Sequence, residues 1–341
     1  MPRKPKSSRS AIINSVFLAV GLVLFIVLLV RLDARTITSQ LQRVGPFFVA
    51  AFLCYVANLF FASLTWRATI DPRHSQASVM DLWHAFWAGH AMNAVTPASG
   101  AGEFLKASLL RGKLEGRELA TSIILYNGIN TAVSAVVAVV GAAICFVFLD
   151  VPRDATGVVL AAAIVVLVLF LTLLWWIRSG AVSHVVRIAG KVPLLRFGKE
   201  EELAEKAKEI DRRMSVFMRN RPSALARSVF LSVCVRLLQI AETWFLLYPL
   251  MPGEEVVLIA ILMQIASQLI VWIAAFVPAK IGVLEGGNAG LFELAGLDPA
   301  TAFTVVLAKR LRMVLGVGIG LVLGSRFLGD RTSYKPSPED P

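Results

Sequence analysis

The sequence predicts an all-α polytopic membrane protein, built as an inverted repeat with about six full spans and two opposed re-entrant broken-helix hairpins. Three observations predict this class. Hydrophobic residues make up 57% of the 341 residues, and several apolar runs reach the roughly 20 residues that cross a bilayer. A short motif of proline, glycine and glutamate occurs twice, and the two copies are flanked by different charges. Paired broken segments of this kind are typical of inverted-repeat transporters.

The apolar runs set the order of the spans. The run at 11–30 follows a basic start, as in a signal peptide, but it is as long as a span and ends without a small-residue cleavage pattern, so we predict a retained first span. Further full spans are expected at residues 46–66, 120–149, 158–177, 229–250 and 301–327. The runs at 80–95 and 256–277 are each followed closely by a proline and lead into the two hairpins.

The repeated motif lies in residues 93–110 (NAVTPASGAGEFLKASLL) and 276–291 (FVPAKIGVLEGGNAGL). Each copy has Pro-Ala, then Gly-x-x-Glu, then a long apolar helix that opens Ala-Thr. Irregular backbone at membrane depth is tolerated only beside protein or a water-filled cavity, so we expect both copies to line a polar pathway. The predicted hairpin-break residues are Pro97, Gly100, Gly102, Pro278 and Gly282.

Flanking charges give the orientation of the two copies. Lysines and arginines surround the first copy, at 67–73 and 111–117, whereas the second lies between PGEE (252–255) and FELAGLDP (292–299), which contain neither. By the positive-inside rule the copies point in opposite directions, and both termini are expected in the cytoplasm. Long apolar helices favour the bacterial cytoplasmic (inner) membrane over an outer-membrane barrel. Three residues oppose this orientation because they would lie outside: Arg31, Arg35 and Arg43.

The expected organisation has four parts. The first membrane half is residues 1–177 with its hairpin around 80–111, and the second is 228–328 with its hairpin around 256–295. Between them, 178–227 is a basic cytoplasmic connector, in which apolar residues at helical spacing predict an amphipathic helix over 199–221. We expect a solvated connector, with anionic lipid binding as the alternative. Residues 329–341 form a disordered tail.

Several function classes find no support. The net charge of +11 comes mainly from helix ends and the connector, where membrane orientation explains it, so no nucleic-acid partner is expected. The three cysteines lie in apolar runs without ligand spacing, so no disulfide, metal site or cofactor is expected. Hydrolase, zinc-protease and phosphate-loop motifs are absent from the sequence, and we do not expect an enzyme.

The motif residues resemble a known family, the flippase-like transmembrane domain of lysylphosphatidylglycerol synthases and its stand-alone relatives. Pro97, Gly102 and Glu103 match its first-half element. The residues that match its later elements are Pro278, Gly282, Glu285, Arg310 and Leu311. The resemblance implies movement of a polar lipid between leaflets. The soluble transferase domain is missing, which argues against lipid aminoacylation, and the single-domain form is similar to a branch associated with hopanoid biosynthesis. Many relatives carry a Glu-Arg pair and a later Asp where this chain has Tyr126, Asn127 and Asn130.

Ionisable residues inside the spans are the site candidates, because a charge at the bilayer centre costs ~3 to ~15 kcal/mol. Glu103 and Glu285 could engage the cationic or hydroxyl part of a substrate, or cap backbone amides at a helix break. Arg310 could bind a phosphate, or form a structural ion pair with Glu285 or Glu242. The predicted substrate-binding set is Glu103, Glu285, Arg310, Arg312, Lys309, Arg236 and Glu242.

The sequence therefore predicts a flippase-like transporter that moves a phospholipid, aminoacylated lipid or hopanoid between leaflets. Membrane lipids are the expected partners, with a second copy of the chain or lipid-biosynthesis enzymes as further candidates. Two alternatives remain: an intramembrane lipid-modifying transferase that uses Glu103 and Glu285 as acid and base, or a non-transporting scaffold of a lipid-synthesis complex. We assign a packing role to four glycines in the last span: Gly316, Gly318, Gly320 and Gly324.

Overall fold

The computed structural model describes residues 27, 34–96, 100–148, 183–184, 200–274, 277 and 280–332. Its helices are α2 (Ala34–Thr69), the short 3-10 helix η1 (Pro72–His74), α3 (Val79–Val95), α4 (Ala101–Leu109), α5 (Gly116–Phe148), α8 (Glu200–Asn220), α9 (Pro222–Leu247), α10 (Val256–Ile273), α11 (Val283–Leu294) and α12 (Pro299–Thr332). The expected spans at 11–30, apart from Val27, and at 158–177 lie outside the described residues, as do Pro97 and Pro278.

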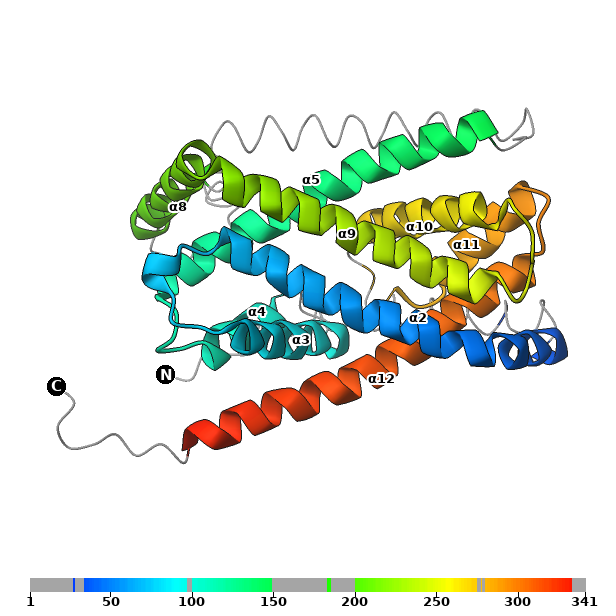
Figure 1. Cartoon of the computed structure of the whole chain (residues 1–341), viewed down its shortest axis with the longest axis horizontal. Coiled ribbons are helices and arrows are strands. Elements are labelled where there is room, and N and C mark those ends of the chain that lie inside the picture. The colour runs from blue at the N-terminus through cyan, green and yellow to red at the C-terminus, as the bar shows by residue number, and fades with distance from the viewer. Residues whose placement is uncertain are drawn as a thin grey trace, which may run out of the picture.

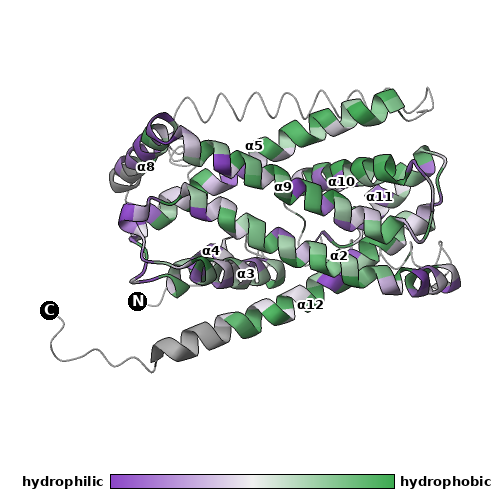
Figure 2. Ribbon diagram, viewed as in Figure 1, coloured by the Kyte–Doolittle hydropathy of each residue, from purple (hydrophilic) through white to green (hydrophobic). Residues whose placement is uncertain are grey.

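Four of these helices, α2, α5, α9 and α10, are long and apolar enough to cross a membrane. Figure 2 shows that their surfaces are mostly hydrophobic, with hydrophilic residues interrupting α9 and α12 partway along their lengths. Large apolar side chains such as those of Phe148 and Ile273 are about 70% exposed, as expected for surfaces that face lipid. The chain is therefore an all-α polytopic membrane protein.

The second expected span extends further than its apolar run. Helix α2 begins at Ala34 and contains Pro46, the residue at which the expected span began. The segment before Pro46 is amphipathic, and its buried residues Ile37 and Val44 recur at helical spacing. This face packs on the core, and these tertiary contacts stabilise the helical conformation on both sides of Pro46. The expected amphipathic helix of the connector forms as α8.

Two helix pairs, α3 with α4 and α10 with α11, enter the bundle from opposite ends (Figure 1). Helices α2 and α9 lie side by side and run antiparallel through the middle of the molecule, and α12 packs across α3 and α2. The outer ends of α3 and α4 lie at the end that holds α8, whereas those of α10 and α11 lie at the opposite end. Both internal breaks therefore lie within the length of the bundle.

A glycine in the left-handed region precedes the second helix of each pair. Gly100 has φ 121° before α4, and Gly282 has φ 78° before α11. Side chains other than glycine rarely adopt these angles, so glycine permits each chain reversal. These two predicted hairpin-break residues thus lie at observed helix breaks.

Gly102, the third predicted break residue in the first copy, has a packing role. A Cβ atom at Gly102 would lie 2.0 Å from the carbonyl oxygen of Gly89 in α3. The amide of Gly102 also donates a hydrogen bond of 2.7 Å to Asn93 Oδ1. Helices α3 and α4 therefore meet backbone to backbone.

The glycines of α12 make similar close approaches on one face of the helix. Cβ atoms at Gly316 and Gly320 would lie within 3 Å of Tyr55 and Trp87 respectively, and one at Gly324 would contact Ala88. Among the residues that the structure describes, none comes within 4 Å of a Cβ atom at Gly318, so the packing role predicted for it is not seen there. The reason is the helical period, because residues four apart share a face and Gly318 lies off it.

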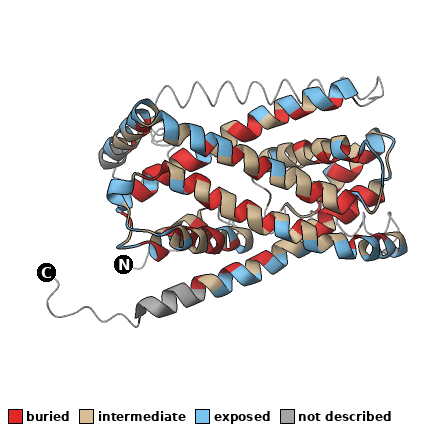
Figure 3. Ribbon diagram, in the orientation of Figure 1, coloured by how far each residue is buried: buried red, intermediate tan, exposed pale blue. Residues whose placement is uncertain are grey.

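Two hydrophobic clusters surround the two helix pairs. One joins α2 to α3, α4 and α5 through Trp66, Phe86 and Leu109. The other joins α2 and α9 to α10, α11 and α12 through Leu247, Phe292 and Val305. Figure 3 shows that buried residues lie on facing sides of the helices, with exposed residues on the outside. Each pair is thus held in place by its own core.

The glycine contact of the first pair gives a stability prediction. We expect Gly102→Ala to lower the free energy of unfolding by about 1–3 kcal/mol, because the added methyl group meets backbone that must shift. Gly318→Ala, with open space around it, is the matched control and should raise it by about 0.5–1 kcal/mol. Thermal unfolding in detergent measures both. Equal midpoints for the two variants would contradict the close approach of α3 and α4.

Candidate functional site

The carboxylate of the first helix pair has a cation on its own helix. Glu103 and Lys106 form an ion pair, with Lys106 Nζ 3.0 Å from Oε1 and 3.1 Å from Oε2. The Lys106 side chain is 6% exposed, and its ammonium lies 4.7 Å from the ring centre of Phe86 and 5.5 Å from that of Trp66. Sequence reasoning missed Lys106, although its position three residues after Glu103 indicates such a pair.

The carboxylate of the second pair is completely buried. Glu285 Oε2 accepts a hydrogen bond of 2.8 Å from the amide of Gly282, which is the contact that the capping alternative describes. Its other oxygen is paired with Arg310 Nε on α12, and the same guanidinium donates to the carbonyl of Lys280 at 3.2 Å. Arg310 therefore holds the helix break of α10 and α11 against α12, as the ion-pair alternative predicts.

A third carboxylate, Glu242 on α9, faces α12. Its Oε1 atom lies 3.0 Å from Arg312 Nε, and the Arg312 guanidinium stacks 4.2 Å from the ring centre of Tyr55. Lys309 points to neutral oxygens instead, with Nζ 2.7 Å from Thr243 Oγ1 and 3.2 Å from Gln264 Oε1. Helix α12 therefore presents two paired arginines and one lysine to its neighbours.

Arg236 differs from these residues because its described partners are all neutral. The side chain lies midway along α9 and is 8% exposed as a residue. Its guanidinium donates to Gln239 Oε1 at 2.7 Å and to Asn130 Oδ1 at 2.6 Å, while the buried Nε atom has no hydrogen-bond partner. Asn130 is an amide, so its contact with Arg236 brings no neutralising charge.

Neutral side chains connect Arg236 to Lys309. Gln264 Nε2 lies 3.4 Å from Gln239 Oε1, and Gln264 Oε1 accepts from both Thr243 and Lys309. We call this set the cationic network: Arg236, Gln239, Thr243, Gln264 and Lys309. It draws on α9, α10 and α12. Its two cations, Arg236 and Lys309, are additional to the three that pair with Glu103, Glu285 and Glu242, namely Lys106, Arg310 and Arg312.

A cavity of about 260 Å³ opens beside one end of the network, between α5, α9 and α10. Its polar lining residues are Ser134, Arg236, Gln264 and Gln268, and the remaining walls are mainly aliphatic. Val140 and Leu237 on its rim are more than half exposed, which places the rim on the lipid-facing surface. The arrangement offers a charged end and an apolar body in one cavity, which suits an amphipathic anion.

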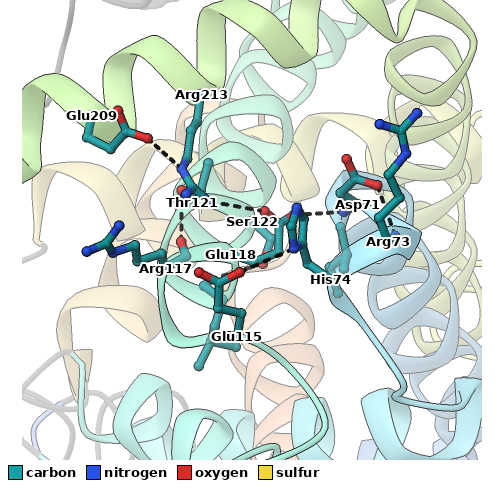
Figure 4. A network of polar contacts seen from close by, with 12 residues as sticks. Asp71, Arg73, His74, Glu115, Arg117, Glu118, Thr121, Ser122, Glu209 and Arg213 are labelled. Atoms are coloured by element: carbon teal, nitrogen blue, oxygen red, sulfur yellow. Dashed lines mark hydrogen bonds and ion pairs between the residues drawn. The ribbon is translucent and has the colours of Figure 1, made fainter.

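A larger cavity of about 660 Å³ lies at the end of the bundle that holds α8. Its charges are matched to one another (Figure 4): Glu209 pairs with Arg213 at 2.9 Å, and Glu118 accepts from the amide of Asp71 at 2.7 Å. Hydrogen bonds from Arg212 and Arg213 lower the pKa of Glu209 to about 2. Arg213 on α8 also lies 3.8 Å from Glu118 on α5, and we interpret this contact as the attachment of α8 to α5, which the Glu118–Asp71 bond links to the loop containing η1.

The structure thus divides the predicted set into two kinds of residue. Glu103, Glu285, Glu242, Arg310 and Arg312 are held in ion pairs within the chain. Arg236 and Lys309 belong to the cationic network. Thr243 was not among the predicted residues, because nothing in the sequence distinguishes a threonine that faces another helix from one that bonds only its own backbone.

The Glu285 contacts give a second stability prediction. Glu285→Gln should lower the free energy of unfolding by about 3–5 kcal/mol, because it leaves Arg310 without its carboxylate. Glu293→Gln, on an exposed position of the same helix, should change it by less than about 0.5 kcal/mol. Thermal unfolding measures both. The double variant Glu285→Gln/Arg310→Gln should lose less than Glu285→Gln alone, and an equal or greater loss would contradict a structural ion pair.

Known proteins support the assignment of this chain to a family. The family model described as "Lysylphosphatidylglycerol synthase TM region" matches residues 13–320, which include both helix pairs and the cationic network. A UPF0104 membrane protein from Pyrococcus horikoshii is 22% identical over 289 residues, covering 81% of this chain and 85% of the relative. No solved structure matches the chain. The chain belongs to the family of the lysylphosphatidylglycerol synthase transmembrane region.

Proposed function

We propose that this protein is a flippase-like transporter that moves an anionic lipid between membrane leaflets, and that the cationic network binds the headgroup. The observation that carries the proposal is the unmatched charge of Arg236 beside a lipid-facing cavity. An unmatched cation in a membrane helix is costly and marks substrate pathways in membrane proteins. Membership of a family named for a lipid synthase agrees with a lipid ligand.

The donor geometry of Arg236 suits an oxyanion. Arginine carries five N–H donors in a planar fork, and the structure gives Arg236 only neutral amide oxygens as partners. A phosphate oxygen would accept a charge-assisted hydrogen bond from the same fork, which is roughly twice as strong as a neutral one. In this proposal the phosphate displaces Gln239 or reaches the unpartnered Nε atom, and the acyl chains lie along the aliphatic walls.

The path across the membrane follows the network. From Arg236, the headgroup would pass Gln264 and reach Lys309, whose present partners are the neutral oxygens of Thr243 and Gln264. Helix pairs that enter from opposite ends give the two halves of an alternating-access device, in which one repeat rocks against the other. Six full spans, with the α8 end and both termini in the cytoplasm of a bacterial inner membrane, belong to the same proposal.

The three ion pairs have a different part in this mechanism. Glu285 and Glu242 are almost completely buried and hold their arginines in place, so we propose that they stabilise the pathway without contacting cargo. The Glu103 side chain is 30% exposed, which leaves it accessible to the cationic part of a zwitterionic or aminoacylated headgroup. We therefore propose that the two hairpin glutamates, each paired with a cation, serve in stabilisation and headgroup contact and not as the general base of a transferase.

Loss of the Arg236 charge should abolish transport without unfolding the protein. We expect Arg236→Gln in proteoliposomes to slow the appearance of a fluorescent phosphatidylglycerol in the opposite leaflet at least tenfold, because the oxyanion loses its charged donor. A membrane-impermeant quencher measures the leaflet, and unfolding in detergent checks the fold. Arg219→Gln, an exposed arginine on α8, is the control with the same change in charge and should transport normally. Undiminished transport by Arg236→Gln would contradict the proposed site.

Supplying the missing carboxylate should separate stability from activity. Asn130→Asp converts the amide whose Oδ1 lies 2.6 Å from the Arg236 guanidinium into a carboxylate, at nearly constant volume. We expect the free energy of unfolding to rise by about 1–2 kcal/mol and phosphatidylglycerol transport to fall, because an internal anion now occupies the cation. The same unfolding and quenching assays measure both effects. A stabilised variant with unchanged transport would show that Arg236 does not bind the headgroup.

A further inference from the structure

A second basic cavity lies on the outside of the bundle, where the end of α2 meets the start of α9. Its volume is about 570 Å³, and three arginines line it: Arg67, Arg221 and Arg227. No aspartate or glutamate is among the lining residues, in contrast to the cavity under α8, which contains Asp71, Glu118 and Glu209. The cavity therefore concentrates positive charge that its own walls do not neutralise.

The three arginines differ in how they are held. Arg221 donates a hydrogen bond of 3.1 Å to the carbonyl of Ile70 and stacks 5.6 Å from the ring centre of Phe217. Arg67 and Arg227 are exposed, and within the described part of the chain neither forms an ion pair or a side-chain hydrogen bond. One guanidinium is thus fixed in position, and two are available to a ligand.

Apolar side chains continue the cavity toward the middle of the membrane helices. Leu64 lies one turn before Arg67 in α2, and Phe230 and Leu231 lie one turn after Arg227 in α9. Because the two helices run antiparallel, both steps lead in the same direction, away from the α8 end. Phe230 is 67% exposed although it is a large apolar residue. Charge at the mouth and apolar surface one turn deeper reproduce the order of phosphate and acyl chain in a phospholipid.

We propose that this groove binds an anionic phospholipid of the adjoining leaflet as a resident lipid, distinct from the transported one. Arginines at helix ends commonly face lipid headgroups as single residues. Here three converge on one cavity, where their planar forks can bind one phosphate from several directions. A free phosphate ion would use the arginines but not the apolar wall, so the wall favours a lipid. The bound lipid would hold the ends of α2 and α9 together.

Lipid binding by purified variants tests the groove. Native mass spectrometry in detergent would count bound dioleoyl phosphatidylglycerol, with dioleoyl phosphatidylcholine as the neutral lipid. We expect phosphatidylglycerol to bind at least tenfold more tightly than phosphatidylcholine, and Arg67→Gln/Arg227→Gln to weaken it about tenfold or more. Arg117→Gln removes an exposed arginine at the same end but outside the groove, and should bind like the wild type. Phe230→Gln should weaken binding of the lipid through its chain.

Two further measurements test whether the bound anion is a lipid or a free phosphate, and whether it binds in the groove or at the transport site. Inorganic phosphate should not raise the unfolding midpoint at concentrations where phosphatidylglycerol does, and an equal rise would overturn the lipid proposal in favour of a free anion. In an Arg236→Gln background, which removes the proposed transport site, Arg67→Gln/Arg227→Gln should still weaken phosphatidylglycerol binding, because the groove does not depend on that site. Unchanged lipid binding in the double variant would overturn the proposal. If the double variant does not fold, Arg227→Gln alone decides in the same way, because that side chain is exposed.

Discussion

The compensation of charge inside the membrane is the constraint on which this structure depends. Isolated charges are excluded from hydrocarbon unless a partner or a cavity receives them. In the described membrane helices, three ion pairs meet this requirement, and each has a distinct geometry: Glu103 with Lys106 inside one short helix, Glu285 with Arg310 across a helix break, and Glu242 with Arg312 between two long helices. The second and third pairs tie α11 and α9 to α12, and the Glu285–Arg310 pair holds the helix break before α11 in place.

Glycine makes the pairing geometry possible. The left-handed angle at Gly282 turns the chain so that its amide and the Glu285 carboxylate face each other at 2.8 Å. In the first helix pair, the contact of Gly102 with Gly89 brings α4 against α3. The Lys106 side chain packs on Gly89. The Lys106 ammonium can then lie over Trp66 and Phe86, where the faces of the rings attract it. Loss of the close approach would also remove this environment.

The sequence was sufficient for features that depend on local pattern and insufficient for those that depend on helix rotation. Apolar periodicity predicted the membrane class and α8, and the repeated motif predicted the breaks at Gly100 and Gly282. The same reasoning gave Arg310 two alternative roles, an ion pair with Glu285 or a phosphate ligand, and could not decide between them. It did not find the cationic network, because a bond from α10 to α12 depends on how both helices are turned about their axes. It also began α2 at Pro46, because an amphipathic start has lower hydropathy than a span.

Arg236 is the exception that gives the arrangement its functional meaning. Elsewhere the described membrane helices match carboxylates with cations, yet beside this guanidinium the chain places an asparagine, which has the size of aspartate without its charge. A neutral acceptor orients the guanidinium but leaves its charge available, whereas a carboxylate would have compensated it. The unmatched charge reduces stability and raises the affinity for an external anion through the same electrostatic term. A site of this kind binds an anion because the protein itself does not supply one.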